Sequence, residues 1–435
     1  MERRTFLQTT LVSVAGASLP ARILAADATP AASTTPAATP APAAPTALEL
    51  ATKRLYELGR RNVAIHDPSA IIKCKDEYWV FYTGNRSYRS KDLLNWTNGP
   101  GGLTGVFDWF YDAVPGYRNG PAYWAPDVSK IGDQYFLFYS ISAFGKNTSA
   151  IGLVTNPTLD PADPDYAWTD QGLVIKSVRE DNFNCIDPCC VADADGKLWL
   201  SFGSFWTGIK MIALDKTGHR IPDSPIYALA QNQKHATATT EGRLEEPINQ
   251  SQIEASYVYR HGKYYYLFVS WGLCCHGITS TYNTRVGRSE KVTGPYLDKD
   301  GVDLAHDGGT LFVGNDGPMV DTIQPTQGGR GGPPPPPQVH AYIGPGQAGI
   351  FEENGKFWFT CHYYDATANG ASILSLRPLT WDASDWPVLG EYPEPAPVPT
   401  VRFQQGRGRR GGGNNQSPPA VAPVQPAPAA STSSS

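Results

Sequence analysis

Five short segments of the chain each carry one polar residue ahead of a strand-like run, a carboxylic acid in four segments and an amide in the fifth. These residues are Asp67, Asp127, Asp187, Glu254 and Gln347. A turn rich in Asp, Gly and Lys follows each, and then alternating aromatic and β-branched residues, as in "YWVFYT". Carboxylates brought together by such a repeat can divide the roles of general acid and general base.

The spacing of these residues points to a repeated β architecture. Successive residues lie 60, 60, 67 and 93 positions apart, and a Gly/Pro-rich stretch at 321–338 accounts for the longest interval. Hairpin signals at this period are typical of propeller blades. We predict an all-β, five-bladed β-propeller over residues 50–402, with 321–338 as an inserted surface loop.

In a propeller, the innermost strand of each blade lines the central channel, so the five polar residues are expected to face one pocket. Like charges held close together cost free energy and push pKa values apart, so such a cluster favours a functional site. The alternative is that each Asp only caps a turn in its own blade.

Both ends of the chain differ in composition from the repeat region. Arg3 and Arg4 precede a weakly apolar run, so we predict a twin-arginine export signal over 1–28, with an ordinary secretory signal as the alternative. Residues 29–49 and 403–435 are rich in Pro, Ala, Gly or Ser and are expected to be disordered. The protein is therefore expected to be periplasmic or extracellular.

Composition narrows the possible partners. The net charge of −5 gives no reason to expect a nucleic acid partner, and no further apolar stretch has the length of a membrane span. We expect a monomer. The seven cysteines show no CxxC spacing, which disfavours a zinc site, so most are expected to be free core residues. A disulfide between the adjacent Cys274 and Cys275 is left open.

An ordered set of motifs carries a resemblance to a known family. The segments "HDPS", "YWAPD", "IDP", "FGSFWTGI", "EASYVY", "GLCC", "GPG" and "HYYD", between about Asn62 and Leu389, resemble the arabinanases of glycoside hydrolase family 43. The resemblance implies a five-bladed propeller, in agreement with the repeat count. It also implies hydrolysis of α-1,5-linked L-arabinan with inversion, with arabinan or its oligosaccharides as substrate.

The resemblance also implies roles for three carboxylates. Asp67 matches the general base, Glu254 the general acid, and Asp187 the third carboxylate, which orients the acid and raises its pKa. An inverting glycosidase needs its two carboxyl groups about 6.5–9.5 Å apart, so that a water molecule fits between them. Positions on opposite blades can supply this separation.

Further residues match positions near the substrate. Trp124 and Phe144 correspond to aromatic residues that contact sugar, with core packing as the alternative. The "FGSFWTGI" motif adds Ser204 and Trp206 as expected substrate contacts. Asp127 is expected beside the substrate too, in a supporting role or a structural hydrogen bond.

The fifth repeat departs from the family pattern, because "GPGQ" stands where the endo-arabinanases have "GPGH". The family's His lies beside a calcium or similar ion. An amide oxygen can also bind a hard cation, so Gln347 either retains a calcium site or makes an ordinary hydrogen bond. His362, in "CHYYD", is not at the matching position, and His66 is expected to fix local geometry.

Two alternative functions remain open at this point. The first is a β-xylosidase or α-L-arabinofuranosidase, since these share the fold and the three carboxylates. The second is a carbohydrate-binding propeller without catalysis, against which the three intact carboxylates argue. The sequence does not decide between endo and exo attack.

Overall fold

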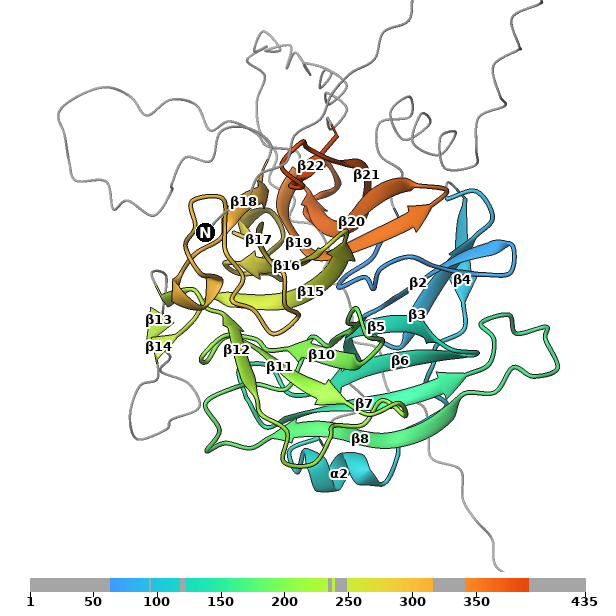
Figure 1. The fold of residues 1–435 in the computed structure, drawn as a ribbon. Coiled ribbons are helices and arrows are strands. Elements are labelled where there is room, and N and C mark those ends of the chain that lie inside the picture. The colour runs from blue at the N-terminus through green and yellow to red at the C-terminus, as the bar shows by residue number, and fades with distance from the viewer. Residues whose placement is uncertain are drawn as a thin grey trace, which may run out of the picture. The chain divides into compact units, whose positions relative to one another are not determined.

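Five antiparallel sheets of four strands form a five-bladed β-propeller, which confirms the predicted fold class (Figure 1). The computed structural model describes residues 63–93, 95–117, 123–233, 237–238, 249–315 and 342–390. The predicted export signal, linker, internal insertion and C-terminal tail lie outside the described residues.

Each blade is a meander whose strands pair in chain order. Blade 1 holds β1 (Ile72–Cys74), β2 (Glu77–Tyr82), β3 (Arg86–Ser90) and β4 (Trp96–Gly99). Blade 2 holds β5 (Tyr123–Ile131), β6 (Gln134–Ile141), β7 (Ser149–Asn156) and β8 (Thr169–Ser177). Blade 3 holds β9 (Cys189–Ala192), β10 (Leu198–Phe202), β11 (Ile209–Leu214) and β12 (Tyr227–Ala230). Blade 4 holds β15 (Ile253–His261), β16 (Tyr264–Trp271), β17 (Asn283–Ser289) and β18 (Thr310–Val313). Blade 5 holds β19 (Tyr342–Glu353), β20 (Lys356–Asp365), β21 (Ala371–Trp381) and β22 (Pro387–Leu389).

The remaining elements are short and lie between blades or in loops. They are the helix α2 (Trp109–Ala113), the 3-10 turns η2 (Gly277–Thr279), η3 (Leu304–His306) and η4 (Ala366–Ala368), and the strand pair β13 (Thr237–Ala238) and β14 (Asn249–Gln250). Within the described ranges, no helix has both the length and the apolar character needed to cross a bilayer.

The hairpin turns form as the sequence predicts. In blades 1, 2, 4 and 5, two residues separate the last pair of the first and second strands, for example between Ile131 and Gln134. Gly132, Gly262 and Asn354 begin three of these turns with φ between 54° and 58°. Two-residue hairpin turns need positive φ at this position, which Gly and Asn adopt most readily.

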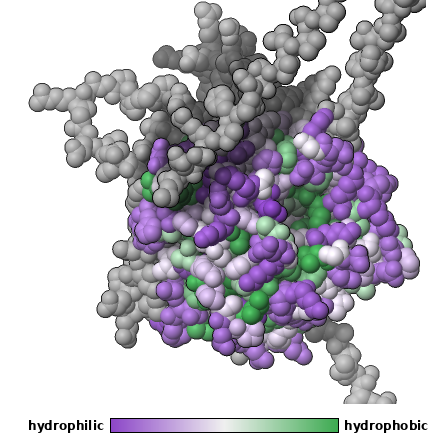
Figure 2. Space-filling view, viewed as in Figure 1, coloured by the Kyte–Doolittle hydropathy of each residue, from purple (hydrophilic) through white to green (hydrophobic). Residues whose placement is uncertain are grey.

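The hydrophobic core consists of five clusters, each between two neighbouring blades. The side chains of strand β6 show why the clusters lie between blades. Tyr135 and Leu137 pack towards blade 1, whereas Phe136 and Phe138 pack towards blade 3. Because side chains alternate between the faces of a strand, a central strand that is apolar at every position is buried on both sides. On the face of the molecule that Figure 2 shows, small hydrophobic groups are scattered among hydrophilic residues.

The start of the described chain closes the ring of blades. Ala64 pairs with Ile373 of β21, the N–H of Ile65 donates to the carbonyl of Ser372 at 3.0 Å, and the N–H of Leu374 donates to Val63 at 3.0 Å. Residues 63–65 thus extend blade 5, and the chain then enters blade 1 through His66 and Asp67. The closure of the ring between blades 5 and 1 therefore fixes the backbone that carries His66 and Asp67.

Candidate active site

One residue near the start of each blade adopts the left-handed conformation. These residues are Asp67 (φ 50°), Ala125 (φ 39°), Asp187 (φ 59°), Ala255 (φ 56°) and Gln347 (φ 59°). Positive φ is uncommon outside glycine, and here it recurs once in every blade. The five blades therefore share a backbone kink at one position.

The kink is held by hydrogen bonds from the preceding blade. The backbone N–H of Asp67 donates to His362 Nδ1 at 3.2 Å, and that of Ala125 donates to Thr83 Oγ1 at 3.0 Å. In the same way, Asp187 and Gln347 donate to the hydroxyls of Ser140 and Ser270, at 3.0 and 3.1 Å. Each of these acceptors lies on, or just after, the second strand of its blade. Neighbouring blades are thereby locked together around the site.

The structural register differs from the repeat inferred from the sequence in two blades. Ala125 occupies the place equivalent to Asp67, so Asp127 lies two residues too far along, and Glu254 lies one residue before its own kink at Ala255. In blades 2, 4 and 5 the kink coincides with a bulge in the pairing of the first two strands, and the polar residue stands at a different position relative to that bulge in each blade. A one-residue offset turns a side chain to the other face of a strand, and bulges are hard to recognise in sequence.

Asp127 consequently points into the wall between blades 2 and 3. Its Oδ2 accepts hydrogen bonds from the N–H of Cys190 at 2.9 Å and from Ser129 Oγ at 3.4 Å. The side chain is buried, and burial raises its pKa to about 7. These contacts match the structural hydrogen bond that the sequence allowed, and substrate contact by Asp127 stays a prediction.

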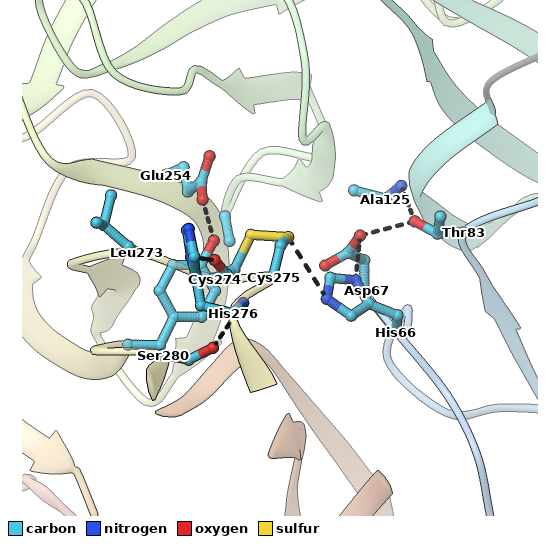
Figure 3. The surroundings of a disulfide bond; sticks show 12 residues. His66, Asp67, Thr83, Ala125, Glu254, Leu273, Cys274, Cys275, His276 and Ser280 are labelled. Atoms are coloured by element: carbon cyan, nitrogen blue, oxygen red, sulfur yellow. Dashed lines mark hydrogen bonds and ion pairs between the residues drawn. A yellow bond between two sulfur atoms is a disulfide. The ribbon is translucent and has the colours of Figure 1, made fainter. Parts of the chain in front are cut away.

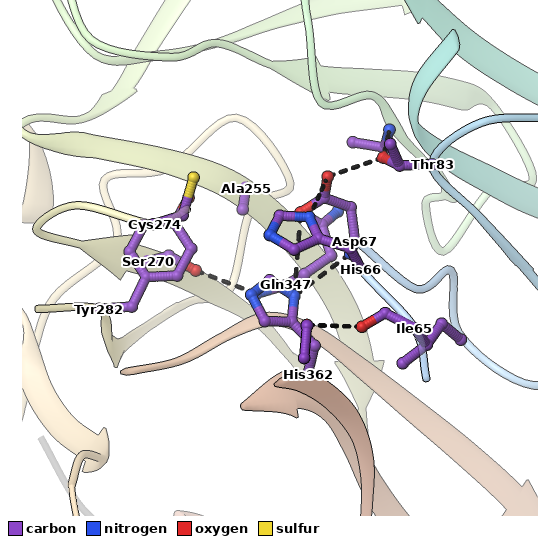
Figure 4. Close-up of polar contacts among 12 residues, drawn as sticks. Ile65, His66, Asp67, Thr83, Ala255, Ser270, Cys274, Tyr282, Gln347 and His362 are labelled. Atoms are coloured by element: carbon purple, nitrogen blue, oxygen red, sulfur yellow. Dashed lines mark hydrogen bonds and ion pairs between the residues drawn. The ribbon is translucent and has the colours of Figure 1, made fainter. Parts of the chain in front are cut away.

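Asp67 lies within a network of polar contacts (Figure 4). Its Oδ2 is 2.8 Å from His66 Nδ1 and accepts a hydrogen bond from Thr83 Oγ1 at 2.7 Å, while its Oδ1 is 3.8 Å from His362 Nδ1. The rings of His66 and His362 stack with centroids 4.4 Å apart. Burial alone would raise the pKa of Asp67, but His66, His362 and Thr83 outweigh it and hold the pKa at about 2.

Glu254 and Asp187 are buried and accept hydrogen bonds from neutral donors. Glu254 Oε2 accepts from Ser204 Oγ at 2.6 Å, and its Oε1 accepts from the hydroxyl of Tyr282. Asp187 Oδ2 accepts from the N–H of Ala255 at 3.1 Å. Burial raises the pKa of both carboxyls; the charge of Asp67 raises both further, and Glu254 raises that of Asp187. The three carboxylates are therefore close enough to interact.

The predicted substrate residues differ in exposure. Phe144, between β6 and β7, is 79% exposed, so it is not a core residue. Trp124 is half-buried, and it precedes the kink of blade 2 as His66 precedes that of blade 1. Ser204 is buried against Glu254, and Trp206 is buried, with its carbonyl accepting from the N–H of Ser251. Their contact with sugar stays a prediction.

The residues around Gln347 do not form a calcium cage. Gln347 is buried and held through its N–H by Ser270. The neighbouring group of His66, Asp67 and His362 offers two imidazoles and one carboxylate, already engaged with one another. Calcium prefers six to eight oxygen ligands, so this donor set does not fit it. No step of the chemistry proposed below uses a metal.

Several residues at the site were not anticipated from the sequence. His362 touches Asp67 although it lies 295 positions away, and Tyr364 contacts His66 at 2.8 Å. Both belong to the motif "HYYD", which was the only indication in the sequence that they lie at the site. Cys274 and Cys275 form a disulfide beside His66 (Figure 3), and the other five cysteines are free and buried, as expected for most of them.

The fold and the site together define a class. Carboxyl groups whose pKa values are driven apart, at the centre of a five-bladed propeller, are what an acid–base hydrolase needs. The chain belongs to glycosyl hydrolases family 43, whose model matches residues 62–387. This confirms the family to which the motifs pointed.

Relatives of the chain are similar over most of their length. An extracellular exo-α-(1→5)-L-arabinofuranosidase of Cellvibrio japonicus is 38% identical over 339 residues, which cover 77% of this chain and 88% of the relative. An extracellular endo-α-(1→5)-L-arabinanase of Bacillus subtilis is 37% identical, covering 76% and 88%.

A solved structure shows the same similarity. The α-L-arabinanase of Cellvibrio cellulosa in complex with arabinohexaose has a TM-score of 0.64 and 36% identity, covering 76% of this chain and 96% of that one.

Proposed function

We propose that the protein is an exported, inverting glycosidase that cleaves α-1,5-linked L-arabinofuranosyl bonds in arabinan or its oligosaccharides. The observation that carries this proposal is the split in pKa between the carboxyls. Asp67 is held ionised by His66, while burial raises the pKa of Glu254. An inverting glycosidase needs this combination of one base and one acid.

In the proposed reaction, Asp67 Oδ1 or Oδ2 takes a proton from the attacking water, and Glu254 gives its proton to the leaving oxygen. Thr83 and His66 hold the carboxylate of Asp67 in place during attack. Ser204 and Tyr282 orient the carboxyl of Glu254. Burial and the charge of Asp67 raise the pKa of Glu254 and help to keep its proton bound, and we assign Asp187 the same role through like-charge repulsion.

The substrate class rests on the relatives. Those compared above are named for α-1,5-arabinofuranosyl activity, in both exo and endo forms. Endo attack is the first candidate because the motifs resemble the endo-arabinanases, and exo attack is the second because the relative from Cellvibrio japonicus is named an exo enzyme. Both relatives are also named extracellular, which supports export, and the twin-arginine route stays a prediction.

Product analysis on linear α-1,5-arabinan tests the proposal. Wild type is expected to release short arabino-oligosaccharides or arabinose, and Glu254→Gln to lose about 10²- to 10⁴-fold in kcat, the usual contribution of general acid catalysis. The early release of long fragments would indicate endo attack. If wild type left arabinan intact but cleaved aryl xylosides, the substrate assignment would be wrong.

Two further readouts complete the test. The anomeric configuration of the first product, followed by proton NMR, distinguishes inversion from retention. A chelator arm tests the predicted calcium: loss of activity that calcium restores would support a metal near Gln347, and unchanged activity would contradict it.

A further inference from the structure

The Cys274–Cys275 disulfide belongs to the loop that follows β16. Adjacent cysteines joined in this way close a small covalent ring, and Cys275 adopts the left-handed conformation (φ 69°). The loop is braced on both sides, by the N–H of Gly272 on the carbonyl of Gln252 and by the N–H of His276 on Ser280 Oγ. The disulfide therefore fixes one specific backbone orientation.

That orientation directs the N–H of Cys275 at a tyrosine. It donates to the hydroxyl of Tyr364 at 2.7 Å, and the same hydroxyl is 2.8 Å from His66 Nε2. Cys275 Sγ also lies 3.8 Å from His66 Nε2. In Figure 3 the disulfide lies between Glu254 on one side and the His66–Asp67 pair on the other. A continuous line of contacts thus joins the disulfide to Asp67.

The hydrogen bonds that lead from Cys275 through Tyr364 and His66 to Asp67 all run in one direction, from donor to acceptor. His66 Nδ1 lies 2.8 Å from Asp67 Oδ2, so in the neutral ring Nδ1 carries the proton and Nε2 is the acceptor. The Tyr364 O–H then donates to Nε2, and its oxygen accepts from the N–H of Cys275 and is contacted by the Ser280 hydroxyl. The role of each group as donor or acceptor therefore determines the role of the neighbouring group.

We propose that the Cys274–Cys275 disulfide and Tyr364 are positioning residues for catalysis, which hold His66 in the tautomer and orientation that fix the carboxylate of Asp67. This inference rests on the proposed function of Asp67 as the base. Second-layer partners of this kind matter because a catalytic group must be held in its productive geometry.

Reduction of the Cys274–Cys275 disulfide is a direct way to break this series of contacts. A dithiol reagent such as dithiothreitol attacks one sulfur to form a mixed disulfide, and its second thiol then closes the reagent's own ring. Two electrons pass to the protein, and Cys274 and Cys275 become thiols. Residue 275 can then leave positive φ, which non-glycine residues disfavour, and its N–H turns away from Tyr364. The remaining cysteines are free and buried, so the reagent has one disulfide to act on.

The experiment compares four forms of the full chain: wild type, reduced wild type, Cys274→Ser/Cys275→Ser, and Tyr364→Phe. We expect kcat on linear arabinan to fall about ten- to hundred-fold in the last three, as is typical for partners of active-site groups, with KM changed less than about twofold. Reoxidation restores the wild type, whereas the double variant does not respond to reductant. Tyr78→Phe, which removes a distant contact to Glu353, is the matched control and keeps full kcat.

Imidazole ¹⁵N shifts give a readout independent of activity. Burial lowers the pKa of His66 but the contact with Asp67 raises it overall, so the spectra are recorded at a pH high enough to neutralise the ring. We then expect His66 to be protonated at Nδ1 in wild type and to become a mixture of tautomers in the three altered forms. The signal is assigned by its loss in His66→Gln. If kcat and the tautomer stay unchanged on reduction and in Tyr364→Phe, the inference is wrong and the disulfide only braces its loop.

The outcomes separate this inference from the proposed function. If wild type does not cleave arabinan, the proposed function fails, yet the tautomer of His66 still reports whether the disulfide positions it. If the double variant does not fold, reduction of native wild type still decides the question.

Discussion

Asp187 accepts a hydrogen bond from the backbone N–H of Ala255, the residue that directly follows Glu254. One carboxylate thus supports the backbone that carries another, and burial followed by the charge of Glu254 raises the pKa of Asp187. This arrangement joins blades 3 and 4 at the site. Its consequences can be measured through the pH dependence of the reaction.

Asp187→Asn is expected to keep the hydrogen bond and remove the charge. Because the two carboxyls repel each other when both are charged, the pKa of Glu254 is expected to fall. Glu254 must be protonated to act as acid, and activity is lost as pH rises through its pKa. The alkaline limb of kcat/KM should therefore move to lower pH. An unchanged limb would show that Asp187 does not tune Glu254.

Thr83→Val removes the hydroxyl that donates to Asp67 Oδ2 and accepts from the N–H of Ala125. The pKa of Asp67, now about 2, should rise. Because the base acts when ionised, the acid limb of kcat/KM moves to higher pH. The unpaired N–H of Ala125 should also lower the free energy of unfolding by about 1–3 kcal/mol.

Thr83→Ser is the control, since it keeps the hydroxyl and should preserve both the acid limb and the stability. Chemical denaturation at pH 7 and rate profiles from pH 3 upwards provide the measurements. Equal behaviour of the Val and Ser variants would contradict a role for the hydroxyl.

Asp127→Asn tests whether this residue is structural. Its pKa in the folded protein is about 7, above the ordinary value of 3.8, because burial disfavours the charge. Between these values the unfolded chain has lost its proton and the folded chain retains it, so rising pH weakens the folded state. Asparagine stays neutral, and its advantage over wild type should grow from pH 4 to pH 7, reaching about 1–3 kcal/mol.

The same variant decides the predicted contact with substrate. If Asp127 is structural, KM for arabinan stays within about twofold of wild type, because groups that do not touch the substrate contribute little to its binding. A tenfold rise in KM, without loss of stability, would instead support direct binding.

Phe144→Ala tests an exposed aromatic residue. Because the side chain is 79% exposed, the free energy of unfolding should change by less than about 0.5 kcal/mol. KM for long arabino-oligosaccharides should rise several-fold, and Phe144→Trp should restore it, since an aromatic ring offers a large contact face. Unchanged KM in the alanine variant would exclude Phe144 from the binding surface.

The sequence by itself determined the number of blades and the family to which the chain belongs. Hairpin turns and runs such as "YFLFYS" specify strands that are buried on both faces, because local propensity and side-chain alternation act over a few residues. The motifs then identified the family and singled out Asp67, Asp187 and Glu254, which the structure brings together.

Only the tertiary structure decided where the side chains of the site lie and which residues contact them. The bulge between Trp124 and Asp127 placed Ala125, and not Asp127, at the kink of blade 2, and this choice depends on pairing with β6. His362 and Tyr364 reached His66 and Asp67 from almost 300 positions away because ring closure joins the two ends of the propeller. Contacts between distant segments depend on the whole fold, and no local pattern specifies them.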